Sequence, residues 1–280
     1  MKKILLSLAL LLSITMVAQQ PLNVMSFNIR LNIASDSLNA WPYRKDKVSS
    51  QILFHEVNLL GVQEALHEQM MDLQQGLTKY KYAGVGRDDG QIKGEYSAIF
   101  YDTVRLQLIA TKTFWLSETP EVPGSKSWDA AITRVATWCK FKDKLTKKVF
   151  FAFNTHFDHI GKVARRESAK LLKQKVKEIA GNTPVIIMGD FNSKPADEPI
   201  QVVLDKDDPL RFTDTKELSP VHYGPTGTFN GFRSKEVDDE PIDYIFVKGK
   251  WKVLQHATIS QTWGGRFASD HFALFAKLKL

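Results

Sequence analysis

Polar residues of types that bind metal ions or phosphate occur five times at the ends of predicted apolar strands. An isolated Asp or Asn in such a place is more often a turn or cap residue. Strand ends on one side of a sheet converge in space, however, so several such groups can build one site on a rigid scaffold. The repeated placement therefore predicts a metal- or phosphate-binding site. The five groups are Phe27-Asn28, Gln63-Glu64, Asn154-Thr155-His156, Gly189-Asp190-Phe191-Asn192 and Ser269-Asp270-His271.

The elements that must position these groups are mostly short strands. A helix is predicted to begin at Trp41-Pro42, because proline is tolerated in a first turn. Another is predicted over residues 163–180, where Leu172, Val176 and Ile179 keep helical spacing. Many strands with few helices favour an α/β sandwich of two stacked sheets with helices outside. Strands are predicted at residues 22–27, 59–62, 97–101, 106–115, 133–141, 149–154, 185–188, 242–247, 253–260 and 272–280.

The N-terminus has the pattern of a cleavable export signal. Lys2 and Lys3 precede an uncharged stretch that ends in the small residue Ala18 and is too short to span a bilayer comfortably. We therefore expect residues 1–18 to be a signal peptide and residues 19–280 to form one domain of a secreted or periplasmic protein. A retained signal anchor is the alternative interpretation.

Composition and charge exclude some classes of protein. The single cysteine, Cys139, excludes an intramolecular disulfide, and its apolar surroundings indicate a core residue. Without Lys2 and Lys3, 36 basic residues face 31 acidic ones, an excess too small to indicate a polyanion-binding surface. The lysine-rich segment 140–148 is interpreted as a hairpin tip. No nucleic-acid-binding module and no long amphipathic membrane helix is present.

The order and spacing of the motifs resemble the endonuclease/exonuclease/phosphatase superfamily. This group includes deoxyribonuclease I, the AP endonucleases, inositol polyphosphate phosphatases, neutral sphingomyelinases and deadenylases. The resemblance covers residues 22–280 and implies a four-layer α/β sandwich, two packed mixed β-sheets flanked by helices. It rests most specifically on Gly189-Asp190-Phe191-Asn192 and Ser269-Asp270-His271, together with Met25-Ser26-Phe27-Asn28, Val62-Gln63-Glu64, Gly94-Glu95-Tyr96 and Ile242-Asp243-Tyr244.

The resemblance implies a metal-dependent phosphoesterase. Mg²⁺, with Mn²⁺ as an alternative, takes hard oxygen ligands and usually one or two protein carboxylates together with substrate phosphate. By resemblance Glu64 is the principal ligand, Asn28 is a neutral oxygen donor beside it, and Asp270 binds the metal or a metal-bound water.

Further residues are assigned to catalysis by the same resemblance. His271 is the central histidine, and Asp243 is the partner that fixes its tautomer. Asp190 takes the proton from the attacking water or orients it, and Asn192 holds the phosphate. Whether Asp190 or His271 is the general base stays open.

A second acid–histidine pair is implied for Glu95 and His156, with His156 contacting the phosphate or helping to protonate the leaving oxygen. A buried, hydrogen-bonded structural histidine is the alternative. Arg134 is a charge on an apolar strand, so we expect it to pair with phosphate or an active-site carboxylate, although an ordinary salt bridge remains possible. Asp158 and His159 either face the substrate or are solvated loop residues.

The predicted function is therefore an exported Mg²⁺-dependent phosphodiesterase or phosphatase. Its substrate stays open among nucleic acid, a lipid head group and a small sugar or inositol phosphate, with a small phosphoester favoured over long duplex DNA. The alternatives are a nuclease acting on DNA or RNA, and a binding protein that kept the fold without the chemistry. The intact set of acidic residues and His271 argues against the binding protein. No stable protein partner is implied, and we expect a monomer.

Overall fold

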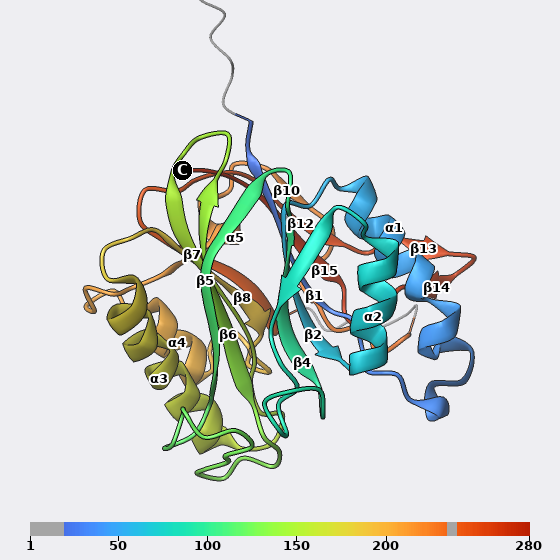
Figure 1. The fold of residues 1–280 in the computed structure, drawn as a ribbon, viewed down its shortest axis with the longest axis horizontal. Coiled ribbons are helices and arrows are strands. Elements are labelled where there is room, and N and C mark those ends of the chain that lie inside the picture. The colour runs from blue at the N-terminus through green and yellow to red at the C-terminus, as the bar shows by residue number, and fades with distance from the viewer. Residues whose placement is uncertain (1–19, 234–239) are drawn as a thin grey trace, which may run out of the picture.

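Two β-sheets pack face to face in the computed structural model, which describes residues 20–233 and 240–280. Helices cover the outer face of each sheet, so the molecule has four layers (Figure 1). This confirms the predicted α/β sandwich. The predicted signal peptide lies outside the described residues.

The first sheet has seven strands in the order β10-β12-β15-β1-β2-β4-β3. It is mixed, because β1 runs parallel to β2 and antiparallel to β15. The sheet therefore brings the carboxyl ends of β1 and β2 to the same edge. Its strands are β1 (Leu22–Asn28), β2 (Leu59–Ala65), β3 (Tyr80–Ala83), β4 (Tyr96–Asp102), β10 (His222–Tyr223), β12 (Lys252–Ile259) and β15 (Ala273–Lys279).

The second sheet has six strands in the order β5-β6-β7-β8-β11-β9. Here β7 and β8 are parallel, and β11 runs antiparallel to β8. The start of β11 therefore lies beside the end of β8. The strands are β5 (Leu106–Trp115), β6 (Val135–Asp143), β7 (Val149–His156), β8 (Val185–Asp190), β9 (Thr213–Asp214) and β11 (Asp243–Lys248).

The helices are divided between the two outer faces. A short ribbon of β13 (Thr262–Trp263) and β14 (Arg266–Phe267) pairs separately from both sheets. Figure 1 shows α1 and α2 on one side of the molecule and α3 and α4 on the other. The helices are α1 (Lys45–Phe54), α2 (His67–Gly76), α3 (Lys162–Ala180), α4 (Glu198–Leu204) and α5 (Thr215–Leu218), with 3-10 turns η1 (Ala34–Asn39) and η2 (Trp41–Tyr43).

Three apolar clusters hold these layers together. The central cluster lies between the sheets, where Leu59 and Ile99 of the first face Ile186 and Met188 of the second. Cys139 belongs to it and is fully buried, as predicted. The second cluster packs the first sheet against α1 and α2, and the third packs the second sheet against α3 and α4. Both faces of each sheet are thus buried, and burial of apolar area is the main stabilising contribution.

Several predicted boundaries differ from the structure. The helix predicted from Trp41-Pro42 is a 3-10 turn followed by α1, because Arg44 has non-helical φ of −132° and ψ of −10°. Helix α2 has too weak an apolar periodicity to be recognised in the sequence. Strand β6 begins at Val135, so Arg134 precedes the strand on which it was predicted. Residues 140–148 do form the β6–β7 hairpin, whose turn is closed by Asp143 accepting from the amide of Leu145 at 2.9 Å.

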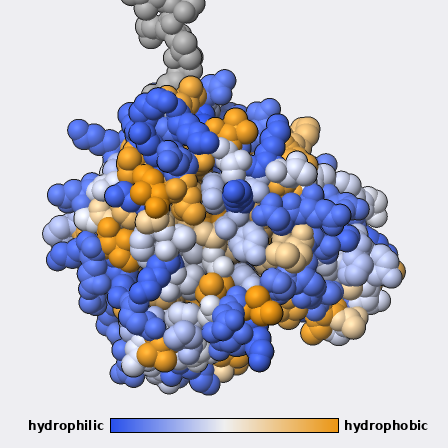
Figure 2. Space-filling view, in the orientation of Figure 1, coloured by the Kyte–Doolittle hydropathy of each residue, from blue (hydrophilic) through white to orange (hydrophobic). Residues whose placement is uncertain are grey.

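The surface seen in Figure 2 is mostly hydrophilic, with apolar residues in small separate groups. Within residues 20–233 and 240–280, none of the helices combines the length and apolar character needed to cross a bilayer.

Candidate active site

All ten predicted site residues lie at one edge of the sandwich. Eight of them line a cavity of about 400 Å³, and the other two, Asn28 and Asp243, are buried directly behind it. The parallel pairs β1–β2 and β7–β8 bring their carboxyl ends to this edge, and the start of β11 joins them. The cavity is lined by Arg30, Leu31, Glu64, Glu95, Ile132, Arg134, His156, His159, Asp190, Asn192, Phe229, Ile242, Asp270 and His271.

Local backbone geometry aims two of these side chains. Glu64 has a φ of +63° in a bulge where the β2–β4 register shifts, and bulges commonly re-aim a side chain beside an active site. Asn192 has a φ of +46°, directly after β8. At Gly189 a Cβ atom would lie 2.2 Å from the carbonyl oxygen of Thr155, so only glycine allows β8 to approach β7 this closely. That approach sets Asp190 beside His156.

His271 lies between two aspartates. Its Nδ1 is 2.9 Å from Asp243 Oδ2, and its Nε2 is 3.7 Å from Asp190 Oδ2. Burial alone would lower the pKa of His271, but the charges of Asp243 and Asp190 hold it well above its usual value. The pKa of Asp190 is itself raised to about 7, by burial and by the charge of Asp243. The geometry expected for the His271–Asp243 pair is therefore present.

Asn28 differs from its expected place as an oxygen ligand. Its Oδ1 accepts a hydrogen bond from the amide of Arg30 at 3.0 Å. Its Nδ2 donates to Glu64 Oε1 and to Asp190 Oδ2, each at 3.0 Å. The amide nitrogen, rather than the oxygen, thus faces the cluster. In this structure Asn28 orients two carboxylates, because its oxygen is needed to close the turn after β1.

Glu64, near the end of β2, and Asp270, on the loop before β15, lie beside the loop that follows β1. The second oxygen of Glu64 accepts from the amide of Leu31 at 3.1 Å. Asp270 lies 3.7 Å from Arg30, and burial together with the nearby charge of Glu64 raises its pKa. The hydroxyl of Ser269 donates to the carbonyl of Asn28 at 2.7 Å and so ties the loops together.

His156 does not form the predicted pair with Glu95. Its Nε2 lies 3.0 Å from Asn192 Nδ2 and 3.4 Å from Asp190 Oδ2, and its Nδ1 has no hydrogen-bond partner among the described residues. Burial and the charge of Arg134 hold its pKa well below the usual value, so the ring is neutral. The amide of Asn192 also donates to the carbonyl of Phe157 at 3.0 Å.

Glu95 pairs with arginine instead. Arg87 Nη1 lies 2.6 Å from its Oε2, and Arg134 Nη1 lies 3.8 Å from the same atom. Glu95 pairs with the guanidinium groups because they are positively charged, whereas His156 is neutral. Arg134 is buried, and its Nη2 reaches His159 Nδ1 at 3.2 Å. Its Nε and Nη1 form no hydrogen bond within the described part of the chain. An active-site carboxylate is thus its neighbour, one of the two partners that its position predicted.

Asp158 is a structural residue that the sequence alone did not identify. It is buried, and its two oxygens accept hydrogen bonds from four backbone amides. Ala131 and Ile132 lie on one side of it, and Ile160 and Gly161 on the other. Asp158 therefore joins the loop before β6 to the loop after β7. The spacing Asp158–Gly161 before a helix was the only available signal.

The acidic groups at this edge fit a divalent cation. Ligand atoms of Glu64, His156 and Asp190 lie within 4.8 Å of one another. The raised pKa values of Asp190 and Asp270 show that carboxylates are crowded and buried here, and a divalent cation would offset that repulsion. Of the expected ligands Glu64, Asn28 and Asp270, only Glu64 belongs to this group. Asn28 turns its nitrogen to the acids, and Asp270 lies on a neighbouring loop at the same edge.

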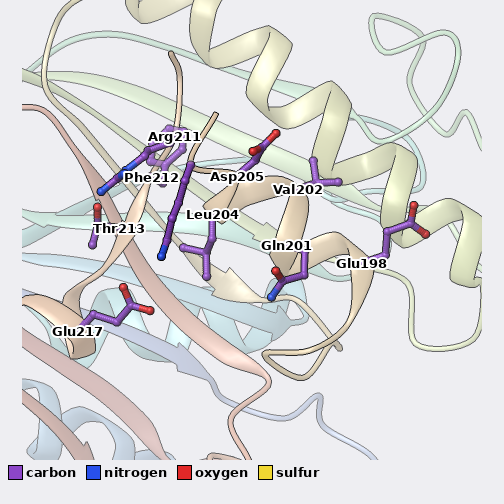
Figure 3. Close-up of a pocket in the computed structure, with 10 residues that line it drawn as sticks. Glu198, Gln201, Val202, Leu204, Asp205, Arg211, Phe212, Thr213 and Glu217 are labelled. Atoms are coloured by element: carbon purple, nitrogen blue, oxygen red, sulfur yellow. The ribbon is translucent and has the colours of Figure 1, made fainter. Parts of the chain in front are cut away.

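A larger cavity, of about 600 Å³, lies elsewhere in the molecule (Figure 3). It is formed by α4, β9 and α5 and contains none of the predicted site residues. Its lining mixes exposed acidic and basic side chains, such as Asp205, Arg211 and Glu217, without a buried unpartnered group. Volume alone would select this cavity, but the chemistry selects the smaller one.

Known proteins match this chain over most of its length. The model of the Endonuclease/Exonuclease/phosphatase family matches residues 25–271. A solved endonuclease/exonuclease/phosphatase from Bacteroides vulgatus is 40% identical, with a TM-score of 0.89, covering 93% of this chain and 99% of that one. A mannosyl-6-phosphatase from Bacteroides thetaiotaomicron is 38% identical, with a TM-score of 0.88, covering 92% and 100%.

The chain spans only part of the length of the curated relatives that it matches. An uncharacterized protein of Acanthamoeba polyphaga mimivirus is 32% identical over 56% of this chain, which spans 61% of its length. Nocturnin of Drosophila melanogaster is 26% identical over 86% of this chain, which spans 42% of that protein.

Proposed function

The chain belongs to the endonuclease/exonuclease/phosphatase family, and from that premise we propose that it is an exported, Mg²⁺-dependent phosphoesterase acting on a small phosphomonoester. The observation that carries the proposal is the contiguous set Asp243–His271–Asp190 beside Glu64. It stands in a cavity of about 400 Å³ that also contains Arg134. Family members are metal-dependent hydrolases of ester bonds, and the acidic cluster fits that requirement.

Glu64 would hold the metal ion as its principal carboxylate, with Asp270 as a further carboxylate at the same edge. A divalent cation supplies charge neutralisation at the phosphoryl oxygens and lowers the pKa of water. Mg²⁺ is proposed because the available ligands are mainly carboxylate oxygens, which it prefers.

The chain's own residues provide the path for protons. Asp190 has a pKa near neutrality, so its Oδ2 is suited to accept the proton of an attacking water. His271 remains protonated beside Asp243, and its Nε2–H can therefore stabilise negative charge on the transferred phosphoryl group. Arg134 lines the same cavity and would supply a guanidinium donor to a phosphate oxygen.

A sugar phosphate is the substrate class that we propose to test first. The cavity has a volume suited to a small ligand rather than to a duplex. The mannosyl-6-phosphatase relative supports the same class, since it is matched over its whole length.

The test is a panel assay of the purified protein with Mg²⁺. Mannose 6-phosphate, bis(p-nitrophenyl) phosphate, phosphocholine lipids, single-stranded RNA and duplex DNA serve as parallel substrates. We expect release of phosphate from the sugar phosphate, abolished by EDTA and restored by Mg²⁺. Turnover confined to nucleic acid would establish a nuclease instead. Failure on every substrate, with intact metal binding, would favour a binding protein.

Export and a monomeric state are proposed together with this activity. The Lys2-Lys3 pair and the uncharged segment up to Ala18 support cleavage of the first 18 residues. Mass spectrometry of the exported protein should give an N-terminus at or near Gln19, and light scattering should give the mass of one chain. An intact Met1 on membrane-bound protein would contradict cleavage.

A further inference from the structure

Arg44 is a buried guanidinium that binds backbone alone. Only 1% of the residue is exposed, and within the described part of the chain it forms no ion pair. Its Nε donates to the carbonyl of Asn39 at 2.8 Å. The rings of Trp41 and Phe232 lie 5.1 and 5.8 Å from its central carbon. Burial of a guanidinium without a directly paired carboxylate costs free energy, so buried charges in proteins are usually paired.

The remaining four donors of Arg44 bind two loops that lead to the active site. Nη1 donates to the carbonyls of Ile29 and, at 3.3 Å, Ala268. Nη2 donates to the carbonyls of Arg30, at 2.6 Å, and Leu31, at 3.4 Å. One planar fork thus connects residues 29–31, after β1, with Ala268, directly before Ser269 and Asp270. A guanidinium presents five donors in a fixed plane, whereas an ammonium group has three donors that rotate about one bond.

These two loops also fix the positions of two candidate metal ligands, Glu64 and Asp270. Leu31 donates its amide to Glu64, and Arg30 pairs with Asp270. Asn28, directly before the first loop, donates to Glu64 as well. The spacing between Glu64 and Asp270 therefore depends on how the two loops are joined, and Arg44 joins them at their base.

We propose that Arg44 is a positioning residue for the divalent cation, acting through the loops that carry Glu64's hydrogen-bond donors and Asp270. It contacts neither substrate nor metal. The inference rests on the proposed metal site but goes beyond it, since Arg44 belongs to none of the motifs at the strand ends.

The first test measures Mn²⁺ and Mg²⁺ binding by isothermal titration calorimetry, without substrate. Arg44→Lys keeps the charge and removes the fork. We expect a loss of about 10–100-fold in metal affinity, the range seen when groups that orient metal ligands are replaced. The increase in Tm on adding Mn²⁺ should shrink in parallel.

Arg105→Lys is the matched control. Arg105 is also largely buried and makes two bonds to Asp143, at 2.8 and 2.9 Å, at the opposite end of β6 from the site. This variant should lose stability and keep metal affinity within about twofold of the wild type, because additive behaviour is expected for distant sites. Equal metal affinities for Arg44→Lys and Arg105→Lys would overturn the proposal.

A second variant keeps the test decisive if Arg44→Lys does not fold. Ser269→Ala removes the other tie between the loops, the 2.7 Å bond to the carbonyl of Asn28. We expect it to weaken metal binding in the same direction.

Where Arg44→Lys folds, the losses of metal affinity in the double variant should be non-additive, because both substitutions loosen one junction. Unchanged binding in Ser269→Ala would likewise contradict a role for this junction. Absence of metal binding in the wild type would instead refute the proposed metal site.

Discussion

His271 is shared between Asp243 and Asp190, and this sharing determines the protonation state of the site. The short 2.9 Å contact favours Asp243 as the permanent partner, while Asp190 stands 3.7 Å from the other nitrogen. Asp243 is buried, and one of its oxygens has no hydrogen-bond partner among the described residues. The positive charge of His271 is therefore the main interaction that offsets the cost of burying this carboxylate. The arrangement leaves Asp190 as the group whose proton affinity lies near neutral pH.

We predict that His271→Ala lowers kcat by about 10²–10³, the usual cost of removing one donor that stabilises developing negative charge. Asp243→Asn should also be damaging, because it removes the charge that keeps His271 protonated. Since the two residues act as a unit, the double variant should lose little more than the worse single variant. Steady-state kinetics of the four proteins measures this. Full additivity of the losses in log rate would show that the pair is not a unit.

Because buried carboxylates are crowded at this site, we predict that the stability of the folded protein depends on pH, and that a bound metal ion changes this dependence. The pKa of Asp190 is raised to about 7 in the folded state, against about 3.9 when unfolded. For an acid with a raised pKa, the protonated folded form is favoured, so stability declines as pH rises from about 4 through 7. Asp270 adds to this trend, because its pKa is also raised. In the protein without metal, Asp190 and Asp270 should therefore contribute less to the free energy of unfolding at pH 8 than at pH 5.

A divalent cation should offset that loss, because it stabilises the deprotonated carboxylates. The difference in Tm between samples with Mg²⁺ and with EDTA should accordingly widen as pH rises from 5 to 8. Thermal unfolding at several pH values measures it, with Glu64→Gln as the control in which the difference should be small throughout. A Tm difference that stays constant with pH would contradict the assigned cluster.

At the scale of elements, the loop before β6 forms one wall of the cavity. This loop carries Ile132 and Arg134, and Asp158 ties it to the loop after β7 through four amides. Asp129 adds a second tie, since it accepts from the amides of Val163 and Ala164 at the start of α3. The wall that faces the substrate is thus held by two aspartates that accept hydrogen bonds from backbone amides, the buried Asp158 and the exposed Asp129.

We predict that Asp158→Ala lowers the free energy of unfolding by about 1–3 kcal/mol, the cost of leaving buried donors unsatisfied. It should also raise KM for the phosphoester more than it lowers kcat, because Arg134 and His159 lose their fixed positions while Asp190 and His271 keep theirs. Asp143→Asn is a suitable control, since Asp143 accepts from the amides of Leu145 and Thr146 in a hairpin remote from the site. A KM unchanged in Asp158→Ala would separate this wall from substrate binding.

At the scale of the whole molecule, the charge does not favour a long polyanion. With Lys2 and Lys3 removed, the net charge is +5, and many of the lysines pair locally. Nonspecific DNA binding depends on many phosphate contacts and weakens steeply with salt. The site itself needs to neutralise only one phosphate group, with the metal ion, Arg134 and His271.

We therefore predict that hydrolysis of a small phosphomonoester changes little in kcat/KM between 50 and 200 mM salt, about twofold at most, because few screened contacts are involved. Duplex DNA should be cleaved poorly at both concentrations. Parallel assays with the two substrates measure this. Efficient duplex cleavage with affinity falling by orders of magnitude over that range would identify a nuclease with a basic surface.

Local sequence patterns were enough to predict the fold class and most strands, and the family resemblance completed the set of site residues. Apolar runs followed by polar groups are local patterns, and they marked Glu64, Asp190 and His271 without any knowledge of packing. Long α3 was recognisable because its apolar spacing extends over several turns. Short elements such as α2 and β3 were not, since α2 depends on packing against the first sheet and β3 on pairing with β4.

Only the tertiary structure decided which partner each polar group takes. Asn28 presents nitrogen rather than oxygen to the acids because the turn after β1 occupies its oxygen. Glu95 faces Arg87 and leaves His156 beside Asp190. Asp158 and Arg44 serve loops that meet only when the two sheets are packed. Residue type and spacing determine what a side chain can bind. Hydrogen-bond partners far apart in the chain are selected by distance and direction, and these are set only when the two sheets pack together.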